Sequence, residues 1–149
     1  MPTYADNKEA RFDYEILETL EAGLVLRGIE TKAVRQGKIS LRGAHVRIRN
    51  NRPVLINSLI SPYQPNNTPE TYNERRDRAL LLHDSQIKKL IGFQQRQGLT
   101  LIPLRVYNKA SRIKIEIALA RGKKKYDKRE YIKKRDFERR KQRELRVKV

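Results

Sequence analysis

Cysteine is absent from this chain of 149 residues, and histidine is scarce, with only His45 and His83. Without cysteine the chain can form no disulfide and offers no thiolate ligand to a metal ion. The two histidines are far apart in the sequence and do not make a zinc- or haem-binding motif. We therefore expect neither a metal site nor a cofactor.

Long apolar runs are also missing. No segment approaches the roughly 18 consecutive apolar residues that a membrane-spanning helix requires. The first residues, Met1 to Asp6, have neither the charged n-region nor the apolar h-region of a secretory signal. We expect a cytoplasmic protein with no membrane partner.

Catalytic motifs are missing as well. The sequence has no Gly-rich phosphate-binding loop and no cysteine nucleophile. Glu15, Glu18 and Glu21 could be called paired acids, but they follow one another along a predicted strand and do not converge on a cleft. We expect that this protein is not an enzyme.

Positive charge is what the sequence has in excess. It contains 35 Lys or Arg against 17 Asp or Glu, a net charge of +18, and residues 121–149 alone carry +10. A segment so cationic, with few large apolar side chains, cannot offset the entropy lost on ordering, so we expect it to be disordered alone. The chain is thus predicted to divide into a folded domain, residues 1–120, and a basic C-terminal tail, residues 121–149.

The tail has the features of a nucleic-acid-binding arm. Glu130 precedes Lys134 by four residues and a second acid-first pair follows, each favouring a helix by roughly 0.2–0.5 kcal/mol. Such pairs do not fix a helix in water, but a polyanion that neutralises the cations would allow one. Tyr126, Tyr131 and Phe137 lie among the cations, and aromatic rings beside cations suit stacking on exposed bases. We expect a tail that becomes helical when bound to RNA or DNA.

The first 120 residues alternate apolar and polar side chains in short stretches, the pattern of β-strands. Strands are predicted over 11–20, 24–26, 39–41, 46–48 and 54–60, with a tight turn at Asn50 and Asn51 because Asn tolerates positive φ. The clearest hairpin joins 99–107 to 112–119, with Ile113, Ile115 and Ile117 facing inward. A meander of this kind favours closure as a barrel or a sandwich.

Two short helices are predicted between the strands. Residues 30–36 lack strand alternation and are followed by Gly37, which suits the C′ position of a helix. Asp84 is a good N-cap for a helix over 85–97, whose apolar stripe of Ile87, Leu90 and Ile91 is predicted to close one end of the barrel. Residues 61–70 contain three prolines and are predicted to form a surface loop.

Several segments, taken together in their order and spacing, resemble the SmpB family of SsrA-binding proteins. They are Asn7–Arg11, Tyr14–Ile16, Glu21–Gly28, Glu30–Arg35 with Gly37, Leu80–His83, and Ala120–Arg129 with Ile132 and Lys133. The resemblance implies a mainly β fold, an oligonucleotide-binding-type antiparallel barrel with flanking short helices. It also implies an adaptor of bacterial trans-translation, which binds the tRNA-like domain of tmRNA and delivers it to stalled ribosomes.

Carried over by position, the resemblance implies a tmRNA-binding surface. Its residues are Asn7, Lys8, Arg11, Glu21, Lys32, Arg35, Leu81, His83 and Lys124. In this assignment the cations hold phosphates and Glu21 accepts hydrogen bonds from base or ribose donors. Leu81 is either an apolar platform under an unstacked base or a core residue.

The chain departs from the family pattern in three places, one of which is the modest change to Thr31 where Val is usual. Phe12 stands where the family usually has His, which keeps a ring but loses a hydrogen-bond donor. Asp77 and Ala79 stand in a run that is usually cationic, which weakens the assignment of a phosphate clamp before the leucines.

For the tail we hypothesise a role in the empty decoding site and mRNA channel of the ribosome, both lined by ribosomal RNA. The residues assigned to it are Lys123, Lys125, Tyr126, Asp127, Lys128, Arg129, Ile132, Lys133 and Phe137. Tyr126 would stack on a base, Lys128 and Arg129 would hold phosphates, and Ile132 and Phe137 would anchor a helix. A small basic ribosomal protein is the alternative to this monomeric adaptor, because composition alone does not separate them.

Overall fold

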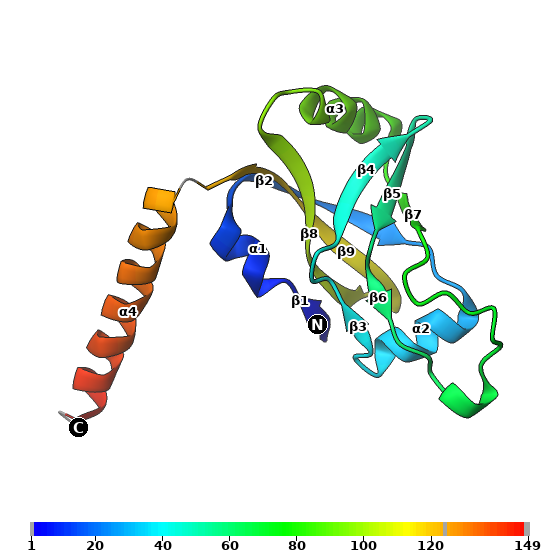
Figure 1. Ribbon diagram of the computed structural model, residues 1–149, viewed down its shortest axis with the longest axis horizontal. Coiled ribbons are helices and arrows are strands. Elements are labelled where there is room, and N and C mark those ends of the chain that lie inside the picture. Colours follow the sequence, from blue (N-terminus) through cyan, green and yellow to red (C-terminus); the bar gives the residue numbers. More distant parts are fainter. Residues whose placement is uncertain (1, 124, 148–149) are drawn as a thin grey trace.

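The computed structural model describes residues 2–123 and 125–147 (Figure 1). The elements in chain order are β1 (Thr3–Asp6), α1 (Lys8–Asp13), β2 (Tyr14–Leu24), α2 (Gly28–Arg35), β3 (Ile39–Ser40), β4 (His45–Arg49), β5 (Arg52–Ile56), β6 (Leu59–Ile60), the 3-10 helix η1 (Pro65–Asn67), β7 (Arg78–Leu81), α3 (Asp84–Gln94), β8 (Leu99–Lys109), β9 (Arg112–Gly122) and α4 (Lys125–Val147). Strands make up most of the body, and α4 stands outside it.

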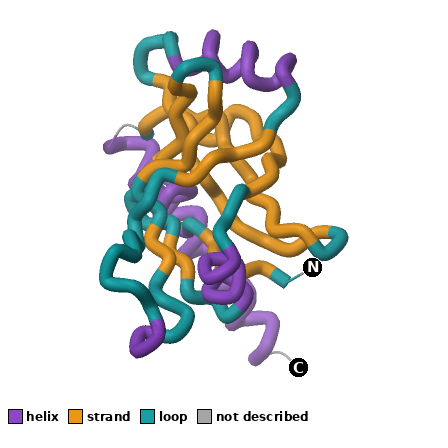
Figure 2. The backbone as a smooth tube through the Cα atoms, turned by 90° about the vertical axis from the view of Figure 1, so that its right-hand side faces the viewer, coloured by secondary structure: helices purple, strands orange, loops and turns teal. Residues whose placement is uncertain are grey.

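The strands of the main sheet lie in the order β1-β8-β4-β5-β7-β2-β9, and β8 also pairs with β9. This additional pairing closes the strands from β8 round to β9 into a ring, drawn in orange in Figure 2. β3 and β6 form a separate antiparallel pair. The ring of antiparallel strands with short helices confirms the predicted mainly β fold and is of the oligonucleotide-binding type.

The ring encloses an aliphatic core that includes Val46, Leu55, Ile115 and Ile117. Leu90 of α3 is fully buried in the same core. Figures 1 and 2 show α3 lying across one end of the ring. The helix therefore covers this end of the ring as predicted, but through Leu90 with Phe93 packed against the core, whereas Ile87 and Ile91 of the predicted stripe are only half-buried.

The helix α1 covers the outer side of β8 and β9. Its Ala10 packs with Ile102, Leu104, Ala118 and Ala120 in a second, smaller cluster. These two strands are consequently apolar on both faces in this region, which fits the run of buried residues at the end of β9.

Residues with positive φ form the turns of the β4–β5 and β8–β9 hairpins. Asn50 and Asn51, between β4 and β5, have φ of 50° and 60°, as the sequence predicted. Ala110 and Ser111, between β8 and β9, have φ of 50° and 64°. The second turn is thus tighter than the predicted loop over 108–111, because β8 and β9 continue to Lys109 and from Arg112.

The helix α2 ends where its sequence predicts. Gln36 is its C-cap, and Gly37 follows with φ of 77°, a conformation in which glycine carries no steric cost. The helix begins two residues earlier than predicted, at Gly28, because Glu30 accepts a hydrogen bond of 2.8 Å from the backbone amide of Arg27 and so stabilises an earlier start.

The predicted strand over 11–20 is wrong at its beginning, because residues up to Asp13 are helical. Asn7 caps α1 by accepting a hydrogen bond from the backbone amide of Ala10. The helix N-cap at Asn7 therefore outweighs the alternation of apolar and polar residues around Phe12 that had predicted a strand. The predicted strand over 24–26 is also wrong beyond Leu24, since β2 is one continuous strand that ends there. No strand was predicted at β1.

Two further boundaries differ from the prediction. The N-cap of α3 is His83 and not Asp84, and the helix ends at Gln94 rather than at residue 97. The strand β9 continues to Gly122, which pairs with Tyr14 of β2. The last strand therefore runs two residues past the expected end of the domain at residue 120.

The basic segment forms α4 in this structure, and Figure 1 shows it beyond the end of β9, on the side of α1. Whether this helix orders only on binding stays a prediction. Among the helices described, none is long and apolar enough to cross a membrane.

Candidate nucleic-acid interface

A groove of about 770 Å³ lies where β2, β7 and β9 meet the start of α3. We call it the Leu81 groove. Glu21, Leu81 and His83 are among its lining residues, together with Lys114 and Arg112 of β9. Three residues of the sequence-predicted RNA surface, distant in the chain, are therefore brought to one place.

Leu81 lies on the outer face of β7, with 65% of its surface exposed. The strand alternates, so Arg78 and Leu80 face inward while Ala79 and Leu81 face outward. The neighbouring strand has Gly23 opposite Leu81, and a Cβ there would lie 3.2 Å from the Leu81 Cβ. The missing side chain at Gly23 leaves room for Leu81 to lie over the sheet. Leu81 is therefore not a core residue, and its role as a platform for a base stays a prediction.

Glu21 is held on the outer face of the sheet by partners on β8. The hydroxyl of Tyr107, a buried residue, donates to its carboxylate, and the Lys109 Nζ is 3.4 Å from both carboxylate oxygens. The Tyr107 hydrogen bond lowers the pKa of Glu21, and burial together with this bond raises the pKa of Tyr107. Glu21 is consequently a fixed, ionised hydrogen-bond acceptor at neutral pH. Sequence reasoning missed Tyr107, because an aromatic residue within a strand is ordinarily read as packing.

His83 is the N-cap of α3, and its backbone amide donates to the Gln86 Oε1 at 3.1 Å. This bond fixes the start of the helix at the rim of the Leu81 groove, while the His83 residue is exposed. His83 is consequently placed at the edge of the groove by the start of α3.

Arg35 borders a smaller adjoining groove of about 270 Å³, also lined by Leu81 and Lys114. Its guanidinium donates to the Ser111 carbonyl at 3.2 Å and to the Tyr4 hydroxyl and the Asn108 side chain at 3.4 Å. Lys32, on the same helix, lies instead 5.8 Å from the ring centre of Tyr63. Only one of these two predicted cations therefore adjoins the Leu81 groove.

Asn7, Lys8 and Arg11 belong to a different surface, at α1. Asn7 is buried, and its side-chain amide donates to the carbonyls of Pro103 at 2.9 Å and Leu41 at 3.4 Å. Its side chain is thus occupied in tying α1 to the sheet. Lys8 is exposed, and Arg11 is 3.9 Å from Asp6. Contact of these residues with RNA stays a prediction, and Lys124 lies outside the described residues.

The residues assigned to the tail fall at the end of β9 and along α4. Lys123 donates through its Nζ to the Arg11 carbonyl at 3.1 Å, which fixes the exit from the body. On α4, Arg129 and Lys133 are exposed, Ile132 is half-buried and Phe137 is 66% exposed. The side chains of Lys125, Tyr126, Asp127 and Lys128 lie outside the described residues.

A buried ion cluster that the sequence did not indicate joins α2 to β7. Glu30 is 1% and Arg78 0% exposed, and the Arg78 Nε donates to the Glu30 carboxylate at 2.8 Å. Arg76 donates to the other carboxylate oxygen. Arg78 also donates to the Ser58 hydroxyl and carbonyl at 3.0 Å. Both arginines are therefore engaged with Glu30, and the weakened phosphate clamp expected from Asp77 and Ala79 stays a prediction.

Among the side chains that the structure describes, no three from His, Asp or Glu gather closely enough to hold a metal ion.

Comparison with known proteins gives one consistent family. The family model described as SmpB protein matches residues 4–147. An SsrA-binding protein of Trichodesmium erythraeum (strain IMS101) is 52% identical over 141 residues, covering 95% of this chain and 90% of that protein. One from Persephonella marina (strain DSM 14350 / EX-H1) is 50% identical, covering 91% of this chain and 88% of that protein.

A solved structure is similar as well. Its description reads "tmRNA-SmpB: a journey to the center of the bacterial ribosome", and it matches with a TM-score of 0.68 and 41% sequence identity. The match covers 84% of this chain and 87% of that chain. Both the sequence and the ring of strands are thus similar to those of proteins described in the same terms.

Proposed function

The chain belongs to the SmpB family, and from this premise we propose that it is a tmRNA-binding adaptor of bacterial trans-translation. It binds the tRNA-like domain of tmRNA and delivers it to stalled ribosomes. The relatives are SsrA-binding proteins, and the similar solved chain is described with tmRNA and the bacterial ribosome. The partners proposed for this chain are therefore tmRNA and the ribosome.

The Leu81 groove is the observation that carries the proposal. An exposed leucine offers a flat apolar platform to an unstacked base, and the fixed Glu21 carboxylate accepts hydrogen bonds from base or ribose donors. Lys114 and Arg112 on the same groove, with Arg35 beside it, supply cations for phosphates. The groove thus combines stacking, selection and charge neutralisation on one rigid sheet.

The tail is proposed to act after tmRNA is bound, in the empty decoding site and the mRNA channel. Tyr126 stacks on a base there, Lys128 and Arg129 hold phosphates, and Phe137 anchors the helix. The exposure of Phe137 on a helix rich in cations supports this role, because an apolar ring in water lacks a partner of its own.

We further propose that the protein acts without catalysis, as a monomer in the cytoplasm, where ribosomes translate. It is divided in function as the sequence predicts, with residues 1–120 binding tmRNA and residues 121–149 addressing the ribosome. Fixing the position of an RNA requires only binding, and the groove and the tail supply it.

Substitution of the groove residues tests the proposal. Leu81→Ala and Glu21→Ala should each weaken binding of the tRNA-like domain by roughly 1–3 kcal/mol, measured by fluorescence anisotropy. Leu17→Ala is the matched control, because Leu17 is also an exposed leucine, at 46%, and does not line the groove. Equal losses for Leu17→Ala and Leu81→Ala, with unchanged thermal unfolding, would remove the groove from the account.

A further inference from the structure

The strand β2 carries three exposed carboxylates, Glu15, Glu18 and Glu21, in a chain whose net charge is +18. Each carboxylate forms an ion pair with a cation of a different element, namely Arg121 of β9, Lys89 of α3 and Lys109 of β8. The proposed function gives a part to Glu21 alone, as a hydrogen-bond acceptor. Because a carboxylate repels phosphate, the other two are unexpected on a strand that binds RNA.

Glu18 is the second carboxylate of the Leu81 groove. Glu18 and Lys89 both line the groove, on the side of α3. The Lys89 Nζ donates to the Glu18 carboxylate and so connects α3 to β2. The Glu18 and Lys89 side chains are 50% and 52% exposed, so a ligand in the groove can reach both.

The charges that line the Leu81 groove have mixed signs. The cations are Lys89, Arg112 and Lys114, and the carboxylates are Glu18 and Glu21. The cations attract the phosphates of any RNA, so they supply affinity without selectivity. A phosphate that approaches Lys89 has to replace Glu18 as the partner of the lysine. A base or ribose with hydrogen-bond donors meets no such penalty, because a carboxylate accepts from it.

Selectivity is a difference of affinities, and it is gained by penalising the wrong ligand as well as by favouring the right one. Glu21, fixed by Tyr107, supplies the favourable contact. Glu18 is suited to supply the penalty, because its partner Lys89 is an exposed cation that a phosphate would otherwise use.

We propose that Glu18 is a selectivity residue of the Leu81 groove. By holding Lys89, it disfavours RNA that lays its phosphate backbone toward α3, and it admits RNA that presents unpaired bases or ribose donors there. The groove therefore selects by exclusion at Glu18 and by recognition at Glu21. The inference rests on the proposed function in that the Leu81 groove binds RNA.

Glu18→Gln in the full chain tests the inference with two labelled RNAs, the isolated tRNA-like domain and a regular RNA duplex, whose bases stay stacked. Fluorescence anisotropy measures both affinities. Affinity for the duplex should rise about three- to fivefold, a modest factor because an exposed ion pair is weak. Its dependence on log salt should steepen by roughly 0.7–0.9, the value of one further phosphate contact. Affinity for the tRNA-like domain should stay within about twofold.

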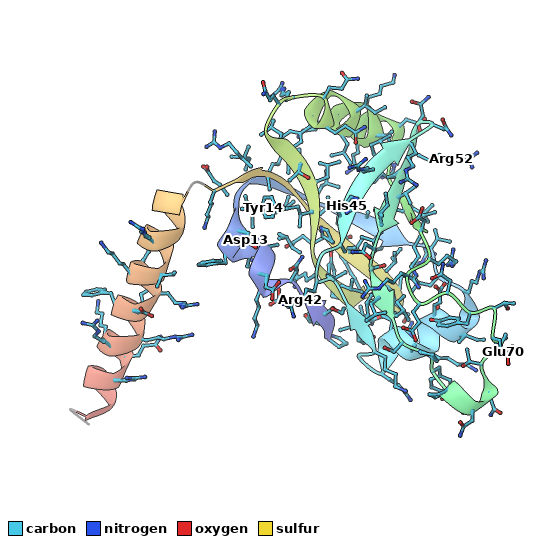
Figure 3. All side chains as sticks on the ribbon, viewed as in Figure 1. Asp13, Tyr14, Arg42, His45, Arg52 and Glu70 are labelled. Atoms are coloured by element: carbon cyan, nitrogen blue, oxygen red, sulfur yellow. The ribbon has the colours of Figure 1, made fainter. Side chains whose placement is uncertain are left out.

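Glu70→Gln is the matched control for the loss of one negative charge. Glu70 is exposed and does not line the Leu81 groove, and Figure 3 shows it at the opposite end of the body from α3. Both affinities of this variant should therefore stay within about twofold of the parent values. Thermal unfolding of each variant shows that it is folded.

Lys89→Gln shows whether Glu18 acts through its partner. Adding Glu18→Gln to this variant should raise the duplex affinity by less than about twofold, because no cation is left to release. Adding it to Lys88→Gln, which removes an exposed cation of α3 outside the groove, should give the full rise. Lysine acylation mapped by mass spectrometry gives a local readout: the duplex should protect Lys89 in Glu18→Gln but not in the parent chain.

Four results would overturn the inference: an unchanged duplex affinity in Glu18→Gln, an equal rise in Glu70→Gln, a change of more than about twofold for the tRNA-like domain, or a full rise in the Lys89→Gln chain. Failure of the proposed function has a different signature. There, Glu21→Ala and Leu81→Ala leave binding of the tRNA-like domain unchanged, whatever Glu18→Gln does to the duplex.

Discussion

Tyr107 determines where the carboxylate of Glu21 lies. It is a buried residue, and its hydroxyl is the first cause of the lowered pKa of Glu21. The Arg105 guanidinium stacks 4.5 Å from the centre of its ring and is itself 3.6 Å from Glu116. The acceptor in the Leu81 groove is therefore positioned by a buried donor and by charges on two neighbouring strands.

Tyr107→Phe should raise the pKa of Glu21 toward its ordinary value, because the variant removes a hydrogen bond to the charged form. Binding of the tRNA-like domain should weaken by roughly 0.5–1.5 kcal/mol, the usual net contribution of one hydrogen bond. NMR titration of the Glu21 carboxyl carbon measures the first effect. Tyr72→Phe is the control, since the Tyr72 hydroxyl donates to the Ile60 carbonyl. A Glu21 pKa that stays unchanged in Tyr107→Phe would contradict this positioning.

Glu30 links stability to pH. Burial alone would raise its pKa, but hydrogen bonds from Arg76, the Arg27 amide and Arg78 outweigh burial and hold the pKa below its ordinary 4.5. A depressed pKa gives stability that is complete above the unfolded-state pKa and is lost as pH falls through the folded-state value. The Glu30 contribution should therefore disappear only in acid, below about pH 4.5.

Glu30→Gln should lower the free energy of unfolding at neutral pH by roughly 3–5 kcal/mol, because it leaves the buried Arg78 charge uncompensated. Stability of the variant should also fall less steeply with acid than that of the parent chain. Urea unfolding across the acid range measures both effects. Glu18→Gln removes an exposed partner of Lys89 and should cost less than about 1 kcal/mol. An unchanged urea midpoint for Glu30→Gln at neutral pH would be incompatible with the buried pair.

At the scale of elements, the sequence predicted the features that depend on the backbone preferences of single residues. Asn50 and Asn51 tolerate positive φ, and Gly37 suits a helix end, so a hairpin and a helix terminus were predicted correctly. The first helix was missed because its six residues depend on the Asn7 cap and on packing of Ala10 against β8 and β9. Neither contact has a signature in the periodicity of the sequence.

The candidate site was predictable only in part, for the same reason. Leu80, Leu81 and Leu82 form an apolar run without alternation. The sequence alone therefore did not show whether the Leu81 side chain faces the core or the solvent. Pairing of β7 with β2 and β5 decides that Leu81 points outward. The burial of Arg78 was equally hidden, because charged residues are ordinarily exposed and its partner Glu30 is far away in the chain.

The helix α4 should be dispensable for tmRNA binding and required for transfer. A chain ending at Lys123 keeps β9 complete, including the bond of 2.9 Å from the Lys123 amide to the Asp13 carbonyl. This shortened chain should bind the tRNA-like domain with nearly full affinity, but it should not support peptide transfer to tmRNA on stalled ribosomes. The affinity and the amount of peptide transferred are both measured with purified components.

The full chain carrying Tyr126→Ala with Phe137→Ala refines this prediction. It retains the charge of the tail and should bind tmRNA normally, while transfer falls sharply because stacking contributes roughly 1–3 kcal/mol per base. Normal peptide transfer by the chain ending at Lys123 would contradict the role proposed for α4.

At the scale of the whole molecule, charge and shape point to a protein that joins RNA segments. The net charge is +18, with +10 in residues 121–149. The ring of strands fixes the Leu81 groove on its surface, and α4 extends beyond the end of β9. A molecule that only coated RNA would not need a fixed carboxylate at Glu21.

The most direct measurement of the central claim is the identity of the RNA that the full chain binds in cells. The protein is purified from a bacterial lysate, and the RNA recovered with it is sequenced, with the Glu21→Ala and Leu81→Ala double variant in parallel. The account predicts one dominant tmRNA species, strongly depleted in the variant, and release of the protein from ribosomes by a high-salt wash. Ribosomal RNA as the dominant species, with stoichiometric protein left on salt-washed ribosomes, would contradict the account and indicate a ribosomal protein instead.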